Sequence, residues 1–261
     1  MLSLKTNFTL IAALATTACV VTDTGVGGGP TTLSLGEGSP IIDGDRVRFN
    51  GGSSPISVFR STNQGAGFQK ENNLANPGGY LTIIGQTGSI EGVAASILAG
   101  DELTQGVSVS RTGETSLPSS GSATFTGPYA GTLVNITNQF HYKDHIVGTA
   151  TVDVDLDNAL VDVAITDRSQ PSVIDAGSDI TFSDLIANDL SLQNDATFEG
   201  SATGGGLRSG AFLRATPSNQ TITGLLGGPE GEEVAGAVSV DHNFSTATLR
   251  EQGFFLATDP Q

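Results

Sequence analysis

Strict alternation of apolar and polar residues in one segment constrains the fold of this chain more than any other feature. In the run IVGTATVDVDL, which begins at Ile146, apolar Val152 and Val154 alternate with Asp153 and Asp155. A period of two is typical of a β-strand that buries one face and wets the other. The segment therefore predicts a half-buried strand in an antiparallel sheet.

The residues that follow return along the same sheet. Asp157 and Asn158 supply a turn, and Val161, Val163 and Ile165 then share one face, which predicts a β-hairpin. Further short strands are expected at near-regular spacing, at Ser122–Thr126, Tyr129–Ile136, Asp179–Leu185, Asp195–Thr203, Ser209–Ala215, Glu233–Val240 and Ala247–Ala257. An antiparallel set of about nine strands must hide its edges, and closure into a barrel is the simplest solution. A two-sheet sandwich remains the alternative.

The pattern before residue 118 is less regular. Short strands are expected at Arg46–Asn50, Ile56–Arg60, Gly79–Gly85 and Gly106–Arg111, and Ile90–Ala99 is the one helix-like piece. The 35 glycines and the recurring Thr, Val and Ser are typical of an all-β protein. The Ser-, Pro- and Gly-rich stretch Thr115–Ser122 marks a boundary. We expect an all-β chain, with a small β-rich domain at residues 33–118 and an approximately eight-stranded antiparallel β-barrel at residues 119–261.

The N-terminus has the features of a secretory signal peptide at residues 1–18. Lys5 precedes the apolar core Phe8–Leu14, which is too short to span a membrane in the mature protein. Cys19, the only cysteine, follows directly and resembles the lipidated residue of a lipobox, although Thr16 stands where a leucine is usual. We expect lipid attachment at Cys19 and a flexible tether at residues 19–32. Cleavage after Ala15, which would release a soluble periplasmic protein, is the alternative.

An ordered series of motifs runs through the second half of the chain. The series consists of SGSATFTGPYAGTL from Ser120, GTATVDVDLDNALVDVAITD from Gly148, DATFEGSATGG from Asp195, GAFLRAT from Gly210, GGPEGEEVAGAVSVD from Gly227 and REQGFFLAT from Arg250. This order resembles the β-barrel domain of transferrin-binding protein B and its smaller surface-lipoprotein relatives in alphaproteobacteria. The resemblance covers residues 115–258. It implies a lipid-anchored protein with an N-terminal handle-like domain and a C-terminal barrel.

The resemblance implies binding but leaves the ligand open. Relatives bind host transferrin, haem carriers or complement factors through variable loops, so their specificity does not transfer. This chain lacks the long lobes and lysine-rich loops of the large transferrin binders, and Ala211, Phe212 and Leu213 replace the aromatic pair usual in the seventh strand. These departures argue against transferrin as the ligand.

The segment HYKDH is the one candidate for ligand contact that the sequence offers. His141, Tyr142 and His145 lie between two expected strands. On a helix the two histidines could chelate a metal, but on an extended loop they are about 13 Å apart, too far for one ion. The segment is therefore expected to be a polar hairpin loop, or an exposed recognition loop that contacts haem through Tyr142 or a histidine.

No motif indicates catalysis. Asp153, Asp155 and Asp157 imitate a calcium loop, but Asn158 and Ala164 stand where an EF-hand needs Gly and Glu, so these aspartates predict a solvated strand face. The sequence has no G-x-S-x-G elbow and no phosphate-binding loop. We expect a protein that is not an enzyme and needs no cofactor or metal.

The charge excludes one class of partner. The formal net charge is −16, from 27 acidic and 11 basic residues, and such a surface repels nucleic acid. We expect a monomeric outer-membrane lipoprotein, surface-exposed or facing the periplasm, that binds a protein or small ligand through barrel loops. The resemblance suggests iron or haem acquisition. The alternatives are a structural envelope protein without a ligand, and a soluble periplasmic solute binder. Filling of the barrel by Phe125, Phe182, Phe198 and Phe212 would argue against the latter.

Overall fold

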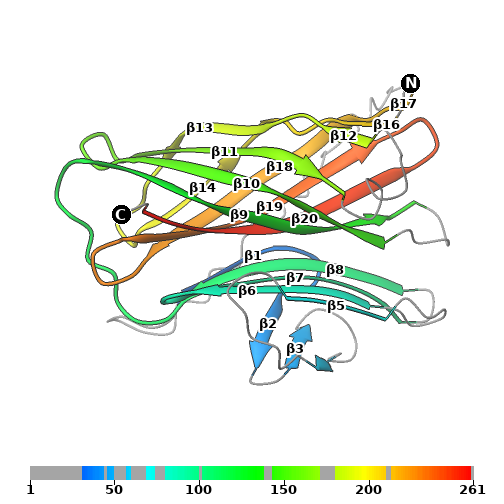
Figure 1. Cartoon of the computed structure of the whole chain (residues 1–261), viewed down its shortest axis with the longest axis horizontal. Coiled ribbons are helices and arrows are strands. Elements are labelled where there is room, and N and C mark those ends of the chain that lie inside the picture. Colours follow the sequence, from blue (N-terminus) through cyan, green and yellow to red (C-terminus); the bar gives the residue numbers. More distant parts are fainter. Residues whose placement is uncertain are drawn as a thin grey trace, which may run out of the picture.

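The computed structural model describes residues 31–43, 46–49, 57–59, 69–73, 80–99, 102–137, 143–170, 180–209 and 213–259. All regular structure in these residues is β-strand, which confirms the expected all-β fold. A curved sheet packs beneath a barrel (Figure 1). Within the described residues, no helix is long and apolar enough to span a membrane.

The sheet below the barrel, called here the handle sheet, has five antiparallel strands in the order β1-β8-β7-β6-β5. Its strands are β1 (Thr31–Gly36), β5 (Gln69–Asn73), β6 (Tyr80–Thr87), β7 (Ile90–Ala99) and β8 (Glu102–Arg111). A second sheet packs on its far side, formed by β2 (Pro40–Asp43), β3 (Arg46–Phe49) and β4 (Ser57–Phe59). The first strand begins at Thr31 and so includes the last two residues of the expected tether.

The helix expected at Ile90–Ala99 is wrong. This segment is β7, which pairs with β6 on one side and β8 on the other. Ile90 and Ala94 pack toward the barrel, whereas Val93 and Ala95 pack toward the second sheet. A strand buried on both faces carries no alternation, so its apolar run cannot be distinguished from a buried helix by periodicity.

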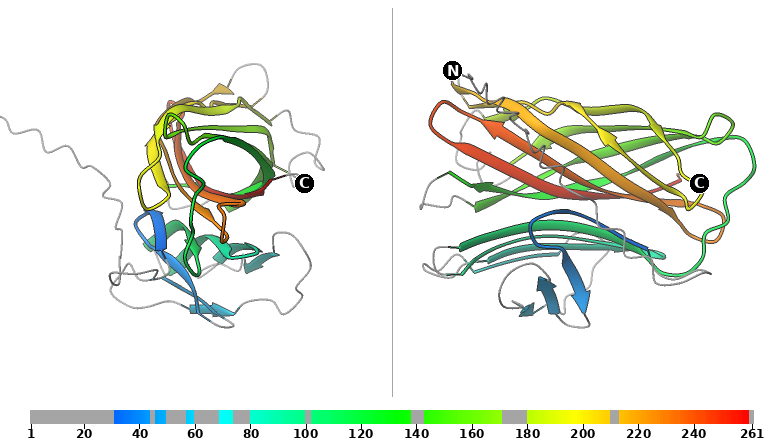
Figure 2. Two further views of the ribbon diagram at one scale, coloured as in Figure 1. Left: turned by 90° about the vertical axis from the view of Figure 1, so that its left-hand side faces the viewer. Right: turned by 180° about the vertical axis from the view of Figure 1, so that it is seen from behind.

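The barrel is nearly closed and follows the order β14-β18-β19-β20-β9-β10-β11-β13-β15. Its strands are β9 (Ser122–Asn135), β10 (Lys143–Asp155), β11 (Leu160–Ser169), β13 (Leu185–Ser191), β14 (Thr197–Ser201), β15 (Thr203–Gly204), β18 (Thr216–Gly227), β19 (Glu233–Asn243) and β20 (Thr248–Thr258). Seen along its axis, the barrel forms a ring (Figure 2). All its pairings are antiparallel, which confirms the expected architecture.

Four expected strands differ from those of the structure, and one strand was not expected. Of the barrel strand expected at Asp179–Leu185, the part Ile180–Phe182 belongs to a separate sheet, and a barrel strand begins only at Leu185. The two strands expected at Ser122–Thr126 and Tyr129–Ile136 are one continuous strand, β9. The long strand β18 was missed, because it opens with TPSNQ, a run of turn-forming residues. The segment Ser209–Ala215 is not a barrel strand. It contributes to a separate three-stranded sheet of β12 (Ile180–Phe182), β16 (Leu207–Ser209) and β17 (Leu213–Arg214).

Side chains fill the barrel interior. Phe125, Tyr129, Phe198 and Phe255 are almost completely buried and belong to one core with the inward-facing valines of β10 and β11. The alternation predicted in β10 is confirmed, since Val152 and Val154 are buried and Asp153 is exposed. Such an interior matches a small barrel whose lumen is a packed core.

The handle sheet and the barrel share a second core, which lies between them. It joins residues of both, among them Leu33, Ile90 and Val107 from the handle sheet and Leu225, Phe254 and Leu256 from the barrel exterior. Gly92 lies against the Phe254 ring, where a Cβ atom would clash. Ser89 donates a 2.6 Å hydrogen bond through Oγ to Glu233 Oε2, which fixes one end of the contact. The two parts are therefore packed as one body.

Candidate functional site

One end of the barrel carries an additional small sheet. At this end, called here the mouth, β9 ends at Asn135, β10 begins at Lys143, and the β19–β20 turn follows Asn243. The sheet β12-β16-β17, called here the cap sheet, lies at the mouth (Figure 1).

Hydrogen bonds beyond the strand ends extend the cap sheet, and apolar contacts hold it on the barrel. Ser183 N donates to Gly206 O at 2.9 Å, and Gly206 N donates to Ser183 Oγ at 2.8 Å. Leu207 and Ala215 are buried in the barrel core, and Ala215 N donates to Leu207 O at 2.9 Å. The inner face of the cap sheet is thus part of the barrel core, and its outer face is turned away from it.

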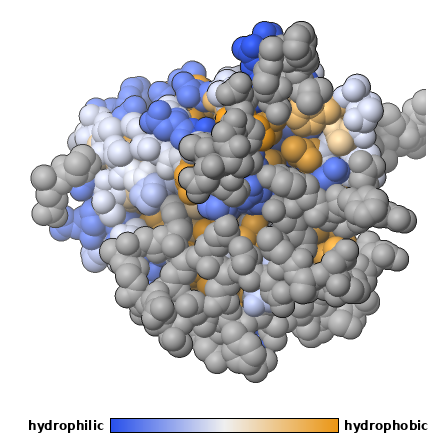
Figure 3. All heavy atoms as spheres, turned by 45° about the vertical axis from the view of Figure 1, so that its right-hand side comes forward, coloured by the Kyte–Doolittle hydropathy of each residue, from blue (hydrophilic) through white to orange (hydrophobic). Residues whose placement is uncertain are grey.

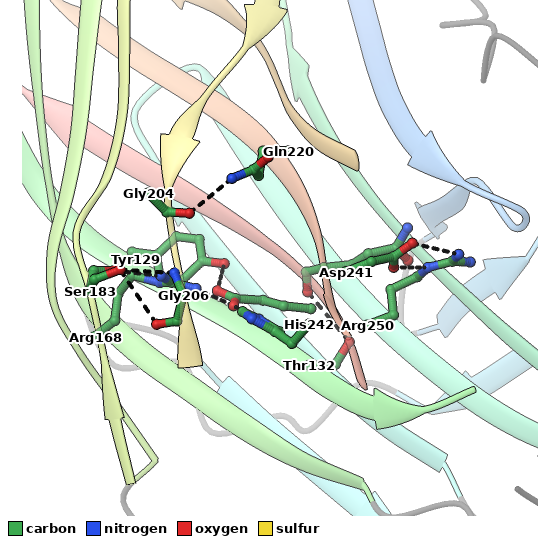
Figure 4. Close-up of polar contacts among 12 residues, drawn as sticks. Tyr129, Thr132, Arg168, Ser183, Gly204, Gly206, Gln220, Asp241, His242 and Arg250 are labelled. Carbon is green, nitrogen blue, oxygen red and sulfur yellow. Dashed lines mark hydrogen bonds and ion pairs between the residues drawn. The ribbon is translucent and has the colours of Figure 1, made fainter. Parts of the chain in front are cut away.

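Arg168, near the end of β11, links the cap sheet to the barrel core. Its Nη1 donates to the carbonyl oxygen of Ser183 at 2.9 Å (Figure 4). Its guanidinium lies 5.0 Å from the Phe182 ring centroid. The Phe182 ring meets His242 edge-on, with a centroid distance of 6.0 Å. A guanidinium over an aromatic face is an attractive contact.

Glu251 in β20 is the centre of a buried polar cluster formed with Tyr129, Arg168 and His242. Its Oε1 accepts the Tyr129 hydroxyl at 2.6 Å, whereas Oε2 accepts from Arg168 Nη2 and lies 2.9 Å from His242 Nε2. All four residues are at most 5% exposed. The four side chains come from four strands, so the cluster crosses the barrel interior.

The cluster is built on the ion pair between Arg168 and Glu251, which Tyr129 and His242 join through hydrogen bonds. Burial raises the pKa of Glu251, but the charge of Arg168, hydrogen bonding and charge from His242, and the Tyr129 hydrogen bond outweigh it and bring that pKa to about 2. Burial, followed by the Glu251 charge, raises the pKa of Tyr129 well above 10. Because a carboxylate only accepts, His242 Nε2 carries the proton shared with Glu251. His242 Nδ1 has no hydrogen-bond partner among the described residues.

This arrangement suits a structural role at the mouth. Its members are closed to solvent, and each polar head contacts another member or the cap sheet. Among the residues that the structure describes, no group of three or more His, Cys, Asp or Glu could hold a metal ion. The cluster therefore fixes the position of the cap sheet on the barrel.

The structure places one of the residues predicted for ligand contact. His145 lies within β10, half-buried and paired with Thr132 of β9, so its expected loop position is wrong. Its Nδ1 lies 3.1 Å from Asp144 Oδ1. His141, Tyr142 and Cys19 lie outside the described residues. The strand extends further toward the mouth than the sequence pattern indicated.

The sequence reasoning missed the buried cluster, although a signal for it was present. His242 continues the inward positions of Val238 and Val240, and Glu251 precedes the inward Phe255 by four residues. Charged or polar residues at inward positions of a strand are costly unless paired. His242 and Glu251 lie an even number of residues from buried apolar residues of the same strand, and this spacing was the signal that could have identified them.

Comparison with known proteins supports the fold. No protein-family model and no curated protein matches the sequence. Among solved structures, intact Ap-TbpB with N and C lobes is similar at a TM-score of 0.50 and 13% identity, covering 91% of this chain and 47% of that one. A mutant of transferrin-binding protein B from Haemophilus parasuis is similar at a TM-score of 0.50 and 10% identity, covering 92% and 46%.

The chain thus spans about half the length of the structures it matches. Sequence identity this low extends the likeness to the fold and not to the ligand. The expectation that the motif series raised is confirmed at that level. The handle sheet packed on a nearly closed antiparallel barrel is a transferrin-binding protein B-like fold.

Proposed function

We propose that this protein is a non-enzymatic lipoprotein of the outer membrane that binds a protein ligand at the barrel mouth. The proposal rests on the structure of the barrel mouth. A filled barrel presents a cap sheet at one end, and a buried ion cluster fixes that cap sheet. Binding residues are commonly carried on loops that a rigid scaffold positions.

The filled interior argues against the alternative of a soluble binder with an internal pocket. Phe125 and Phe198 are buried in the lumen, and Phe182 packs partly buried at the mouth. Phe212 lies outside the described residues. A ligand would therefore contact the outside of the mouth. Iron or haem acquisition remains a proposal, because the similar structures are transferrin binders by name and share only the fold.

The anchor proposal rests on Cys19 and has its own test. Cells that express the protein are labelled with a fatty-acid probe, and Cys19→Ala is the matched control. We expect label on the wild-type protein and none on the variant. If the wild-type protein is not labelled, the proposal of a lipid anchor is refuted and the soluble periplasmic protein remains as the alternative.

The binding proposal is tested by exposure and capture. Proteinase treatment of intact cells should cleave a surface-exposed protein, and the immobilised protein should recover a reproducible protein from host serum or growth medium. If capture recovers nothing reproducible across both sources, a purely structural envelope role replaces the proposed one.

A further inference from the structure

A row of polar side chains crosses the handle sheet on the face turned away from the barrel. Thr32 of β1 is the direct partner of Ser110 of β8, and Ser110 is the direct partner of Glu91 of β7. The residue next to each of them in its strand packs toward the barrel, namely Leu33, Val109 and Ile90. Because successive side chains of a strand point to opposite faces, Thr32, Ser110 and Glu91 lie on the far face. Directly opposite residues have Cβ atoms about 5 Å apart, so the three polar groups are neighbours.

This row lines part of a groove between the handle sheet and β2, called here the handle groove. Its volume is about 230 Å³, and its apolar lining comes from Ile41 and Ile42 of β2 and Val93 of β7. Ser108 Oγ donates to the carbonyl oxygen of Pro40, which holds the start of β2 against the handle sheet. The polar row and the two isoleucines are half-buried, so the groove is open to solvent. The handle groove therefore combines three polar side chains with an apolar wall.

The carboxylate in the handle groove has no cation beside it. Within the part of the chain that the structure describes, no hydrogen bond or ion pair engages the Glu91 side chain. Arg111 of β8 is directed to the opposite face of the sheet, where it donates to Leu226 O at 2.8 Å and to Asp195 O at 2.7 Å. Hydrogen bonds between a cation and a carboxylate are about twice as strong as those between neutral groups. Glu91 is therefore available to a cation that brings its own donors.

We propose that the handle groove binds the side chain of a lysine on a protein partner. An ammonium group has three donors, and the polar row offers three acceptors, which are the carboxylate of Glu91 and the hydroxyl oxygens of Thr32 and Ser110. The four-carbon stem of lysine is apolar and would lie along Ile41 and Ile42. An open groove suits a side chain whose backbone stays outside it.

The handle groove lies at the end of the handle sheet opposite the mouth. Glu91 is two residues from Ser89, which is bonded to Glu233 at the start of β19, and β19 ends at the mouth. The first strand begins beside the groove, at Thr31, but residues 19–30 contain no lysine or arginine that could fill it. The proposed occupant is therefore a lysine of another molecule, and the inference goes beyond binding at the mouth.

A second acidic surface shows that charge is not the whole argument. The outer face of β10 and β11 carries Asp153, Asp155 and Asp162 around another groove. Each of these carboxylates already accepts a hydrogen bond, from Thr124, Asn158 and the backbone of Asp189 respectively. Hydrophilic residues also cover much of the barrel surface seen in Figure 3. General attraction of a cation to this acidic chain would therefore spread over the barrel, whereas an unpaired carboxylate beside an apolar wall favours the handle groove.

The test is an NMR titration that follows the backbone amide signals of the isotope-labelled protein. The probe is Nα-acetyl-lysine methylamide, which carries one lysine side chain and no other charge. We expect shifted signals to cluster at the handle groove, with a Kd on the order of 1 mM. The same compound acetylated at Nε has no charge and should leave these signals unchanged. Ethanolamine, whose ammonium lacks the apolar stem, should bind more weakly.

Variants separate the contributions of charge and of the hydroxyl groups. Glu91→Gln keeps the shape of the side chain but removes its charge, and should bind the probe about tenfold more weakly or worse. Glu199→Gln, at an exposed position on the barrel, is the matched control and should bind like wild type. The double variant Thr32→Val, Ser110→Ala keeps the carboxylate and should bind about threefold more weakly. Unchanged signals outside the groove show that each variant is folded.

Four results would overturn the inference. These are no shifts at the handle groove, equal binding by wild type and Glu91→Gln, equal binding of the probe and its Nε-acetylated form or of ethanolamine, and larger shifts at residues 153–162 than in the groove. The last result would mean that the probe responds only to the general negative charge of the barrel. Serum capture tests binding at the mouth separately, so either proposal can fail without the other.

Discussion

Replacing Glu251 with glutamine leaves the Arg168 guanidinium buried without its counter-charge. Removing one partner of a buried ion pair typically destabilises a protein by about 3–5 kcal/mol. The pKa gives a second route to the magnitude. A carboxyl group whose pKa falls from 4.5 to about 2 on folding contributes about 3 kcal/mol at neutral pH. Both routes predict that Glu251→Gln costs about 3 kcal/mol at pH 7.

The stability lost in Glu251→Gln depends on pH, because it comes from the ionised carboxylate of Glu251. Because the pKa of Glu251 is lower in the folded state, its contribution is fully present above the unfolded value of 4.5 and is lost as the pH falls toward 2. Glu251→Gln lacks that contribution at every pH. The stability gap between wild type and variant should therefore shrink to less than half at pH 3.

Urea unfolding followed by far-UV circular dichroism at pH 7 and pH 3 measures both quantities. Urea is preferred because guanidinium salt screens charges. Glu199→Gln, at an exposed position of β14, is the matched control and should change the stability by less than about 0.5 kcal/mol. A Glu251→Gln variant within about 1 kcal/mol of wild type at pH 7, or a gap that does not narrow at pH 3, would refute the reasoning.

Three further substitutions test the packing. Gly92→Ala places a methyl group against the Phe254 ring and should destabilise the protein by about 1–3 kcal/mol in urea unfolding, with no loss expected if the handle sheet moves freely on the barrel. Ser89→Ala removes the 2.6 Å hydrogen bond to Glu233 and should cost about 1–3 kcal/mol by the same measurement. Phe198→Ala empties part of the lumen and should cost about 3–5 kcal/mol; a loss below about 1 kcal/mol would contradict a packed interior.

Local pattern was sufficient where one face of a strand is wet. Val152, Val154 and the aspartates between them specified a strand, its buried face and its hairpin partner, and the pairing of β10 with β11 agrees with all three. The ordered motif series extended this to the barrel. These predictions succeeded because a period of two reports directly on burial when one side of the sheet meets solvent.

The sequence pattern did not predict a strand that is buried on both faces or a strand that begins with turn-forming residues. β7 is covered on both faces, by the barrel and by the second sheet, so its sequence lacks the alternation that marks a strand. β18 was missed because the turn-forming residues at its start masked the strand behind them. In both segments the structure depends on the neighbouring strands, whose residues lie outside any short stretch of sequence around the segment.

The sequence by itself determined the all-β class and the faces of the strands that have one side in solvent, because these follow from residue periodicity and turn chemistry. The ordered motif series then favoured a barrel over a sandwich. Only the tertiary structure decided which distant residues meet. Tyr129, Arg168, His242 and Glu251 come from four strands, and their polar groups converge only when the barrel closes. Spacing along the chain does not encode contacts of this kind, which arise from sheet closure and register.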